Sequence, residues 1–219
     1  MTGSNASPPA PIAVGRIAES QYHDAVAVLA QAFYDDPTVH FAHPDPGRRR
    51  AWLNHTYAMH VRSGLRYGEV YVSSDVSGAA IWLQPGKAPV TVSQMVQMGA
   101  VAWMLRSGLG VTRRCLAWVE ASKKLHKQCL TVDHWYLAFL GVDPSRQGQG
   151  IGSALLQPVL KRADADGLCC YLDTSSPRAL RLYERNGFEI RAEADIPGGG
   201  PHTWAMVREP RKGAVSGEQ

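Results

Sequence analysis

Residues 140–153 read LGVDPSRQGQGIGS, and this stretch decides the fold. Just before the glycines, the apolar run Trp135–Val142 is almost continuous, which predicts a strand buried on both faces. Beyond them, residues 153–164 predict a helix. The glycines at 148, 150 and 152 lie between these two elements, where the missing Cβ atoms let a ligand approach the backbone closely. The stretch is therefore predicted to be a strand, a glycine loop and a helix, in that order.

This glycine loop favours binding of a diphosphate, because the N-terminus of a helix presents free N–H groups and a positive dipole end. Two nucleotide patterns do not fit. The spacing lacks the G-x-x-x-x-G-K-[ST] of a P-loop, and it differs from G-x-G-x-x-G. A dinucleotide fold would also place its loop after the first strand, whereas this one follows about the fourth. An ordinary strand-to-helix turn remains the alternative.

Working outward, the chain alternates between strand and helix patterns. Ser20 is a candidate N-cap for the first helix, and residues 34–37 end that helix. Strands are expected near 12–18, 69–74, 79–83, 169–174, 188–192 and 202–207, and helices near 20–33, 47–63, 92–105, 112–128 and 177–185. We therefore predict a mixed α/β fold with a sheet of six or seven strands, helices on both faces, and a helical insertion over residues 85–132 before the loop-bearing strand.

Composition limits the function classes. The 219 residues are 45% hydrophobic with a net charge of +4, which suits one globular domain and a polyanionic ligand but falls short of a nucleic-acid footprint. The most apolar stretch, 92–105, is too short and too polar to span a membrane. We expect a flexible arm over 1–11 without a signal peptide, a single domain over 12–208 and a flexible tail over 209–219.

Cysteine usage indicates a reducing compartment. The four cysteines form no C-x-x-C pattern and no zinc-site spacing, and two of them are adjacent in a predicted strand. They are Cys115, Cys129, Cys169 and Cys170. We therefore expect a cytoplasmic protein without a bound metal.

Three ordered motifs resemble the GNAT (Gcn5-related) N-acetyltransferase superfamily. The family loop [QR]-x-x-G-x-[GA] is matched by Gln147-x-x-Gly150-x-Gly152, and the preceding LGVDP of 140–144 is similar to the family's strand end. At the family's usual distance, residues 183–188 read YERNGF, which looks like the family's Y-x-x-x-G-F. This resemblance implies an acetyl-CoA-dependent N-acetyltransferase with a GNAT-like sheet.

A narrower resemblance is to the puromycin N-acetyltransferase branch. It is carried by LDTSSPR at 172–178, by the Pro and Gly-Pro positions of 197–204, and by Ala32-Phe33 with Asp36-Pro37. The similarity is patchy outside residues 133–207. It implies a small-molecule amine, such as an aminonucleoside or another antibiotic, as the acceptor.

The family resemblance also implies where acetyl-CoA binds. The backbone of the loop-bearing strand would pair with the pantetheine arm, and the glycine loop would hold the diphosphate. Many relatives have Asn where this chain has Ser176, which is also a natural N-cap before Pro177. Arg146 is equally a phosphate partner or a solvated cation. The implied cofactor residues are Leu140, Gly141, Val142, Gln147, Gly148, Gln149, Gly150, Ile151, Gly152, Ser153 and Ser176.

Tyr183 lies at the family's proton-donor position. An amine that attacks the thioester directly expels a thiolate, which a phenol can hydrogen-bond or protonate. Reference pKa values of about 10 and about 8.5 make full transfer uphill by roughly 2 kcal/mol, so Tyr183 stabilises the thiolate at least as much as it protonates it. The alternative is an aromatic ring that packs the last helix on the sheet. The base stays open among Asp173, Glu69 and His134.

In the puromycin-acetylating relatives the two N-terminal helices help enclose the acceptor, so the resemblance implies an acceptor site at their junction, with Tyr34 and Asp36 as candidate residues. Here an aromatic face and a carboxylate would hold a flat protonated amine. Helix ending is the alternative for both residues. The helical insertion is either a packed hairpin or a wall of the acceptor pocket. Two other functions stay open: acetylation of a protein N-terminus or lysine, and a non-catalytic acyl-CoA-binding regulator. The assembly is left open, with a homodimer among the possibilities.

Overall fold

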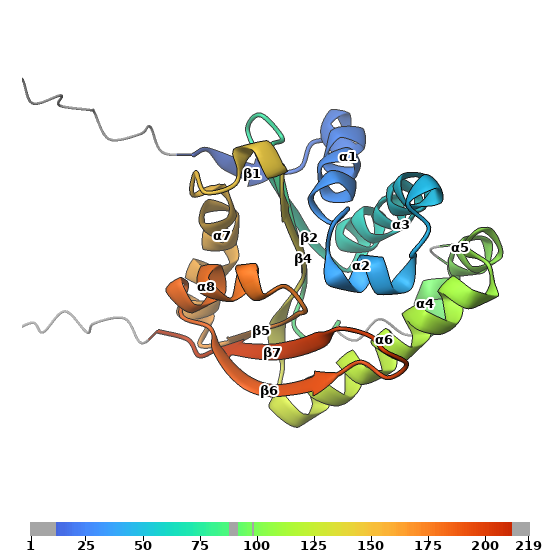
Figure 1. The fold of residues 1–219 in the computed structure, drawn as a ribbon. Coiled ribbons are helices and arrows are strands. Elements are labelled where there is room, and N and C mark those ends of the chain that lie inside the picture. Colours follow the sequence, from blue (N-terminus) through green and yellow to red (C-terminus); the bar gives the residue numbers. More distant parts are fainter. Residues whose placement is uncertain (1–11, 88–91, 98, 212–219) are drawn as a thin grey trace, which may run out of the picture.

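The computed structural model describes residues 12–87, 92–97 and 99–211, so most of the expected arm over 1–11 and tail over 209–219 lies outside the described residues. The described residues form one seven-stranded sheet in the order β1-β2-β3-β4-β5-β7-β6 (Figure 1). Only the β4–β5 pair is parallel. This confirms the predicted mixed sheet. Its strands are β1 (Val14–Arg16), β2 (Gly68–Ser73), β3 (Gly78–Leu83), β4 (His134–Val142), β5 (Cys169–Thr174), β6 (Glu189–Asp195) and β7 (His202–Arg208).

Helices cover both faces of the sheet (Figure 1). Alternate residues of β3 show this, because Ala80 and Trp82 pack in one buried cluster and Ala79 and Ile81 in another. The first cluster lies under α7 and α8, and the second under α1 and α3. The helices are α1 (Tyr22–Ala32), α2 (Pro37–Ala42), α3 (Pro46–Tyr67), α4 (Val92–Gln97), α5 (Ala100–Ser107), α6 (Leu109–Cys129), α7 (Ile151–Asp166) and α8 (Pro177–Arg185).

The insertion consists of three helices, α4, α5 and α6. Leu125 of α6 is buried against Tyr171 of β5 and Val207 of β7. Because Tyr136 packs there while its neighbours Trp135 and Leu137 face α7, helix α6 covers the same face of the sheet as α1 and α3. The insertion is therefore part of the main layer of helices.

One local prediction about the N-terminal helices is wrong. Ser20 lies within a 3-10 turn (Glu19–Gln21), and α1 begins after it at Tyr22 with Gln21 at the N-cap position. Residues 34–37 follow the end of α1 at Ala32, as predicted, and the Asp36-Pro37 pair also begins α2, a helix that the sequence pattern did not predict. Asp36 accepts a hydrogen bond from the backbone N of Thr38 at 2.8 Å, and Pro37 occupies the first helical position.

Candidate active site

A gap between β4 and β5 is the central feature of the candidate site. The two strands are joined by three residue pairs, and the last of these is Tyr136↔Tyr171. Beyond that pair, β4 continues to Val142 against β3 alone, and β5 continues to Thr174 against β7 alone. The facing edges of Leu137–Val142 and Leu172–Thr174, called the strand gap below, are therefore without a strand partner. Their free N–H and C=O groups can pair with an extended ligand as an added strand would.

The glycine loop lies at the end of β4. Gly148 and Gly150 have φ of 79° and 86°, in the left-handed region that favours glycine. Gly150 is the N-cap of α7 and supplies no side-chain hydrogen bond to the helix. The first N–H groups of α7 have no intrahelical partner, so they can bind an anion. A Cβ at Gly148 would meet nothing within 4 Å, which leaves this side of the loop open to a ligand.

Side chains of the loop hold its shape. Gln147 Nε2 donates to the backbone oxygen of Val142 at 3.2 Å. Arg146 Nε donates to Gln149 Oε1 at 3.0 Å, and its guanidinium pairs with Asp75 at 3.2 Å. Arg146 was expected to be either a phosphate partner or a solvated cation. The structure shows a third arrangement, an ion pair that ties the loop to the β2–β3 turn.

Two further predicted cofactor residues, Gly141 and Ser153, have structural roles that the sequence pattern does not reveal. A Cβ on Gly141 would lie 2.9 Å from Leu29 Cδ2, so the glycine lets α1 pack closely on β4. Ser153 Oγ accepts a hydrogen bond from Asn186 at 3.1 Å. Ser176 is at the N-cap position of α8 but makes no side-chain cap bond, so the expected capping role of its hydroxyl is wrong.

Tyr183 is buried in α8, with 7% of its surface exposed and its ring edge-on to Phe188 at 5.9 Å. Its hydroxyl forms no hydrogen bond to a described residue. Burial raises the pKa of Tyr183 above its usual value of 10, and the charges of Asp36 and Asp173 raise it further. The phenol is therefore protonated near pH 7, and its proton is free to be donated to a ligand.

Asp36 approaches the same region from the other face of the sheet. It is partly buried, and burial raises its pKa in spite of the hydrogen bond from Thr38. Its charge raises the pKa of both Tyr57 and Tyr183. Among the described residues, Asp36 has no ion-pair partner. A partly buried carboxylate without a cation attracts one from a ligand.

Tyr34 packs against the start of α3. Its hydroxyl donates to the backbone oxygen of Pro46 at 3.4 Å, and the guanidinium groups of Arg49 and Arg50 lie 5.3 Å and 5.7 Å from its ring centroid. Tyr34 thus contacts the first turn of α3. Its role in acceptor binding remains a prediction.

Sequence reasoning missed an aromatic group from α3 and β4. His60 packs on Phe139 with ring centroids 4.4 Å apart and the ring planes tilted by 43°, and Tyr57 meets Phe139 edge-on at 5.4 Å. Burial lowers the pKa of His60 to about 4, so its imidazole is neutral. These three rings belong to no motif. Only the helical spacing of Tyr57, Val61 and Gly64 in α3 could have indicated that this face of the helix is buried.

Two of the three candidate bases are committed to other contacts. Glu69 pairs with Arg16 and with Arg162, and Tyr71 donates to it at 2.8 Å. Burial raises the pKa of Glu69, but the hydrogen bonds from Arg162 and Tyr71 outweigh this and lower it overall. His134 contacts the backbone oxygen of Val132 through Nδ1 at 2.6 Å and His126 through Nε2 at 2.7 Å. Asp173 remains.

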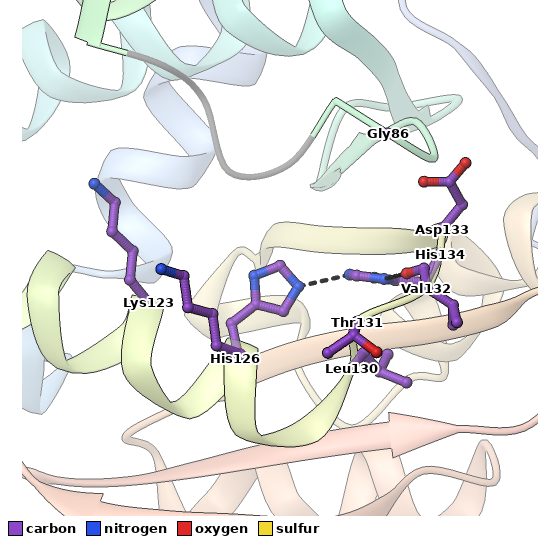
Figure 2. A pocket seen from close by; sticks show the side chains of 9 residues that line it. Gly86, Lys123, His126, Leu130, Thr131, Val132, Asp133 and His134 are labelled. Carbon is purple, nitrogen blue, oxygen red and sulfur yellow. Dashed lines mark hydrogen bonds between the residues drawn. The ribbon is translucent and has the colours of Figure 1, made fainter.

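A cavity of about 170 Å³ lies at the opposite end of β4 from the glycine loop. Figure 2 shows the hydrogen bond between His126 and His134 at this cavity. Lys123 and Lys127 of α6 also line it. None of the predicted cofactor residues does, so this cavity is separate from the strand gap.

No described helix is long and apolar enough to cross a membrane. Within the described ranges, no three His, Cys, Asp or Glu side chains are grouped as metal ligands.

Known proteins are similar to this chain in sequence and in fold. Residues 100–188 match the model of the acetyltransferase (GNAT) family. An uncharacterized N-acetyltransferase of Schizosaccharomyces pombe is 28% identical over 185 residues, which are 81% of this chain and 74% of that protein. A solved structure from Corynebacterium glutamicum, described as histone acetyltransferase HPA2 and related acetyltransferase, is 25% identical with a TM-score of 0.63. The match covers 93% of this chain and 99% of that one.

A third match concerns the fold alone. Arylalkylamine N-acetyltransferase 2 of Aedes aegypti superposes with a TM-score of 0.63 at 17% identity, covering 91% of this chain and 99% of that one. The two chains therefore share an arrangement of strands and helices.

Proposed function

The chain belongs to the GNAT acetyltransferase family and is an acetyl-CoA-dependent N-acetyltransferase, and from this premise we propose that its acceptor is a small primary amine with a flat, apolar body. One observation carries the proposal. The free hydroxyl of Tyr183 and the unpaired carboxylate of Asp36 act on the same region from opposite faces of the sheet. One group suits the leaving thiolate and the other suits the incoming ammonium.

The proposed acetyl-CoA site is the strand gap with the glycine loop. The N–H groups of residues 148–153 would bind the diphosphate, and the backbone of Leu140 and Val142 would pair with the pantetheine arm. Left-handed φ angles at Gly148 and Gly150, and the open space beside Gly148, support this fit. Bound there, acetyl-CoA supplies the activated acetyl thioester.

The proposed role of Tyr183 is that of general acid. Its high pKa keeps the phenol protonated until the carbon–sulfur bond begins to break. As negative charge develops on sulfur, a hydrogen bond from the phenol becomes stronger than it was to the neutral thioester. A hydrogen bond that is stronger in the transition state than in the ground state lowers the activation barrier. A hydrogen bond of equal strength in both states would not accelerate the chemical step.

A small acceptor is favoured by the enclosure of the site. Helix α6 packs beside α2, where Arg114 Nε donates to the backbone oxygen of Ala42 at 3.0 Å. This contact joins the N-terminal helices to the insertion, and we propose that it narrows the entrance for an acceptor, whereas an extended polypeptide would need an open groove. The rings of His60 and Phe139 are partly exposed and offer an apolar surface for a flat ligand, with the buried ring of Tyr57 packed against them.

The two likenesses point to the same acceptor class. The Aedes aegypti structure is that of an arylalkylamine acetyltransferase. The puromycin-branch motifs at 172–178 and 197–204 agree with an aromatic amine. We therefore propose aromatic amines, including aminonucleoside-like amines, as the acceptor class.

A thiol-release assay tests this proposal. The enzyme is incubated with acetyl-CoA and a panel of arylalkylamines, aminonucleosides, linear polyamines and peptides. We expect amine-dependent release of coenzyme A with the aromatic amines, and a gain of one acetyl group in the product mass. Release with peptides alone would replace the small acceptor with a protein, and binding of acetyl-CoA without release would indicate a regulator.

A further inference from the structure

Helix α6 brings a serine to the carboxylate that lies at the strand gap. Ser122 Oγ donates to Asp173 Oδ2 at 2.9 Å, and the Tyr136 hydroxyl donates to Asp173 Oδ1 at 2.8 Å. Asp173 lies two residues beyond the last β4–β5 pair, Tyr136↔Tyr171. The carboxylate is therefore held at the point where the two strands separate, by one donor from β4 and one from the insertion.

Asp173 faces the side of the sheet from which an acceptor would enter. Side chains alternate along β5, with Leu172 in the cluster under α7 and α8 and Tyr171 in the cluster under α6. Asp173 therefore faces α6, as its bond to Ser122 shows. This is the face covered by α1 and α2, from which Asp36 also acts on Tyr183.

Among the described residues, no cation neutralises this carboxylate. Asp173 forms no ion pair with any of them, and its side-chain partners are two neutral hydroxyls. Its own backbone N–H also bonds to the carboxylate, so three of about four lone-pair sites are occupied and one remains for a proton. Burial outweighs these hydrogen bonds and raises the pKa of Asp173 above its usual 3.8. A carboxyl group with a raised pKa is a better proton acceptor than an exposed one.

The titratable groups around Asp173 are neutral near pH 7. Burial raises the pKa of the surrounding phenols and thiol, and it lowers the pKa of the nearby imidazole to about 4. On β7, the residue paired with Asp173 is Ala205, which carries no titratable group. The titratable neighbours are Tyr136 on β4, Tyr171 on β5, His126 and Cys129 on α6, and Tyr183 on α8.

We infer that Asp173 is the catalytic base for the acceptor amine, and that Ser122 of α6 and Tyr136 of β4 are its positioning residues. This inference rests on the proposed function. It names the group that removes the proton, and it gives the insertion a part in the active site.

The proton balance is complete without another reactant. Asp173 takes one proton from the ammonium, and the freed lone pair of nitrogen forms the new bond to the acetyl carbon. The carbon–sulfur bond breaks with its electron pair on sulfur, and Tyr183 protonates the thiolate. The second proton lost by nitrogen restores the phenol. Asp173 then releases its proton to water, so acetyl-CoA and an ammonium yield an amide, a thiol and one proton.

The two groups assist each other. The negative charge of Asp173 contributes to the raised pKa of Tyr183. Once Asp173 has accepted a proton, that contribution disappears and Tyr183 becomes a stronger acid. Proton uptake from the amine therefore prepares the phenol for donation to sulfur.

The test is the pH dependence of kcat/KM for an amine that the wild-type enzyme acetylates. In Asp173→Asn we expect kcat/KM near pH 7 to fall about 10²- to 10⁴-fold and then to rise with pH, because only the neutral amine reacts without a base. Acetyl-CoA affinity, measured by calorimetry, should not change. Asp173→Glu should restore part of the rate. Asp166→Asn, at an exposed position at the end of α7, is the matched control.

Ser122→Ala separates positioning from a purely structural role. The Ser122 bond lowers the pKa of Asp173, so its loss should move the acid limb of the profile to higher pH while acetyl-CoA still binds. An Asp173→Asn enzyme with the wild-type pH profile of kcat/KM would overturn this inference and leave the proposed function standing. Equal losses of acetyl-CoA affinity in Asp173→Asn, Asp173→Glu and Ser122→Ala would do the same. If the wild-type enzyme acetylates no amine, the proposed function fails and the inference fails with it.

Discussion

Asn186 Nδ2 donates to Ser153 Oγ at 3.1 Å, and this bond joins the end of α8, which carries Tyr183, to the first turn of α7. The same nitrogen donates to the backbone oxygen of Leu182 at 2.8 Å, and Asn186 Oδ1 accepts from Gln157 at 3.1 Å. The proposed acid and the proposed diphosphate loop are thereby held in one relative position.

Replacing Asn186 with alanine should therefore cost both stability and rate. The side chain is buried, so its loss leaves Ser153 without its donor. We expect the free energy of unfolding to fall by about 1–3 kcal/mol in urea denaturation, and kcat to fall with it. Gln157→Ala, which removes a partner from an exposed position, should change both much less. Equal effects in the two variants would argue against the positioning role of Asn186.

Tyr183→Phe keeps the edge contact with Phe188 and removes only the hydroxyl. We predict that kcat falls about 10²- to 10⁴-fold while the affinity for acetyl-CoA is unchanged, because the hydroxyl acts on the leaving sulfur. Tyr67→Phe, at the end of α3, is the control and should leave kcat as it is. Wild-type turnover in Tyr183→Phe would reduce this residue to core packing.

Asp36→Asn should raise KM for the amine and leave acetyl-CoA binding constant. Asparagine preserves the cap of α2, since both side chains accept a hydrogen bond from the helix N-terminus, so only the charge is lost. The exposed neighbour provides the control, because Asp35→Asn removes an equal charge outside the site. If the two variants gave the same KM, Asp36 would serve the helix alone. Tyr34→Ala, assayed in parallel, tests the predicted aromatic wall.

The buried imidazoles predict the direction of the pH dependence of stability. Burial lowers the pKa of His60 from 6.5 to about 4, so between these values the unfolded chain binds more protons than the folded one. The free energy of unfolding should therefore fall as pH falls from about 6.5 towards 4. His60→Phe should show a weaker fall, and the exposed control His23→Phe the wild-type fall. Denaturation at several pH values measures this, and an unchanged slope in His60→Phe would contradict it.

The loop and its two flanking elements were predictable because their signals are local. An apolar run, spaced glycines and a helical pattern are contiguous in residues 135–164, and the structure has β4, the loop and α7 there. The strands β6 and β7 were also predicted, near 188–192 and 202–207. Their order in the sheet was not, since β7 lies between β5 and β6, and hydrogen bonding between β5 and β7 depends on residues that are far apart in the sequence.

The acceptor side of the site was less predictable for the same reason. Ser122 and Asp173 are 51 residues apart, and only the packing of α6 on β5 brings them together. Helix α2 was missed because it has six residues, too few for a helical period to show, and because Asp-Pro both ends and begins helices. Periodicity identifies the face of an element, whereas contacts between elements need the tertiary structure.

The acetyl-CoA site in the loop and strand gap is the central claim, and calorimetric titration with acetyl-CoA tests it most directly. Gly150→Trp is compared with Gly167→Trp, because both glycines have left-handed φ, at 86° and 67°, and flank the same helix α7 at opposite ends. The backbone strain of the two variants is thus matched. We predict at least about a 100-fold loss of affinity in Gly150→Trp, equivalent to roughly 2.7 kcal/mol, and wild-type affinity in Gly167→Trp. Unchanged affinity in a folded Gly150→Trp enzyme would contradict the account.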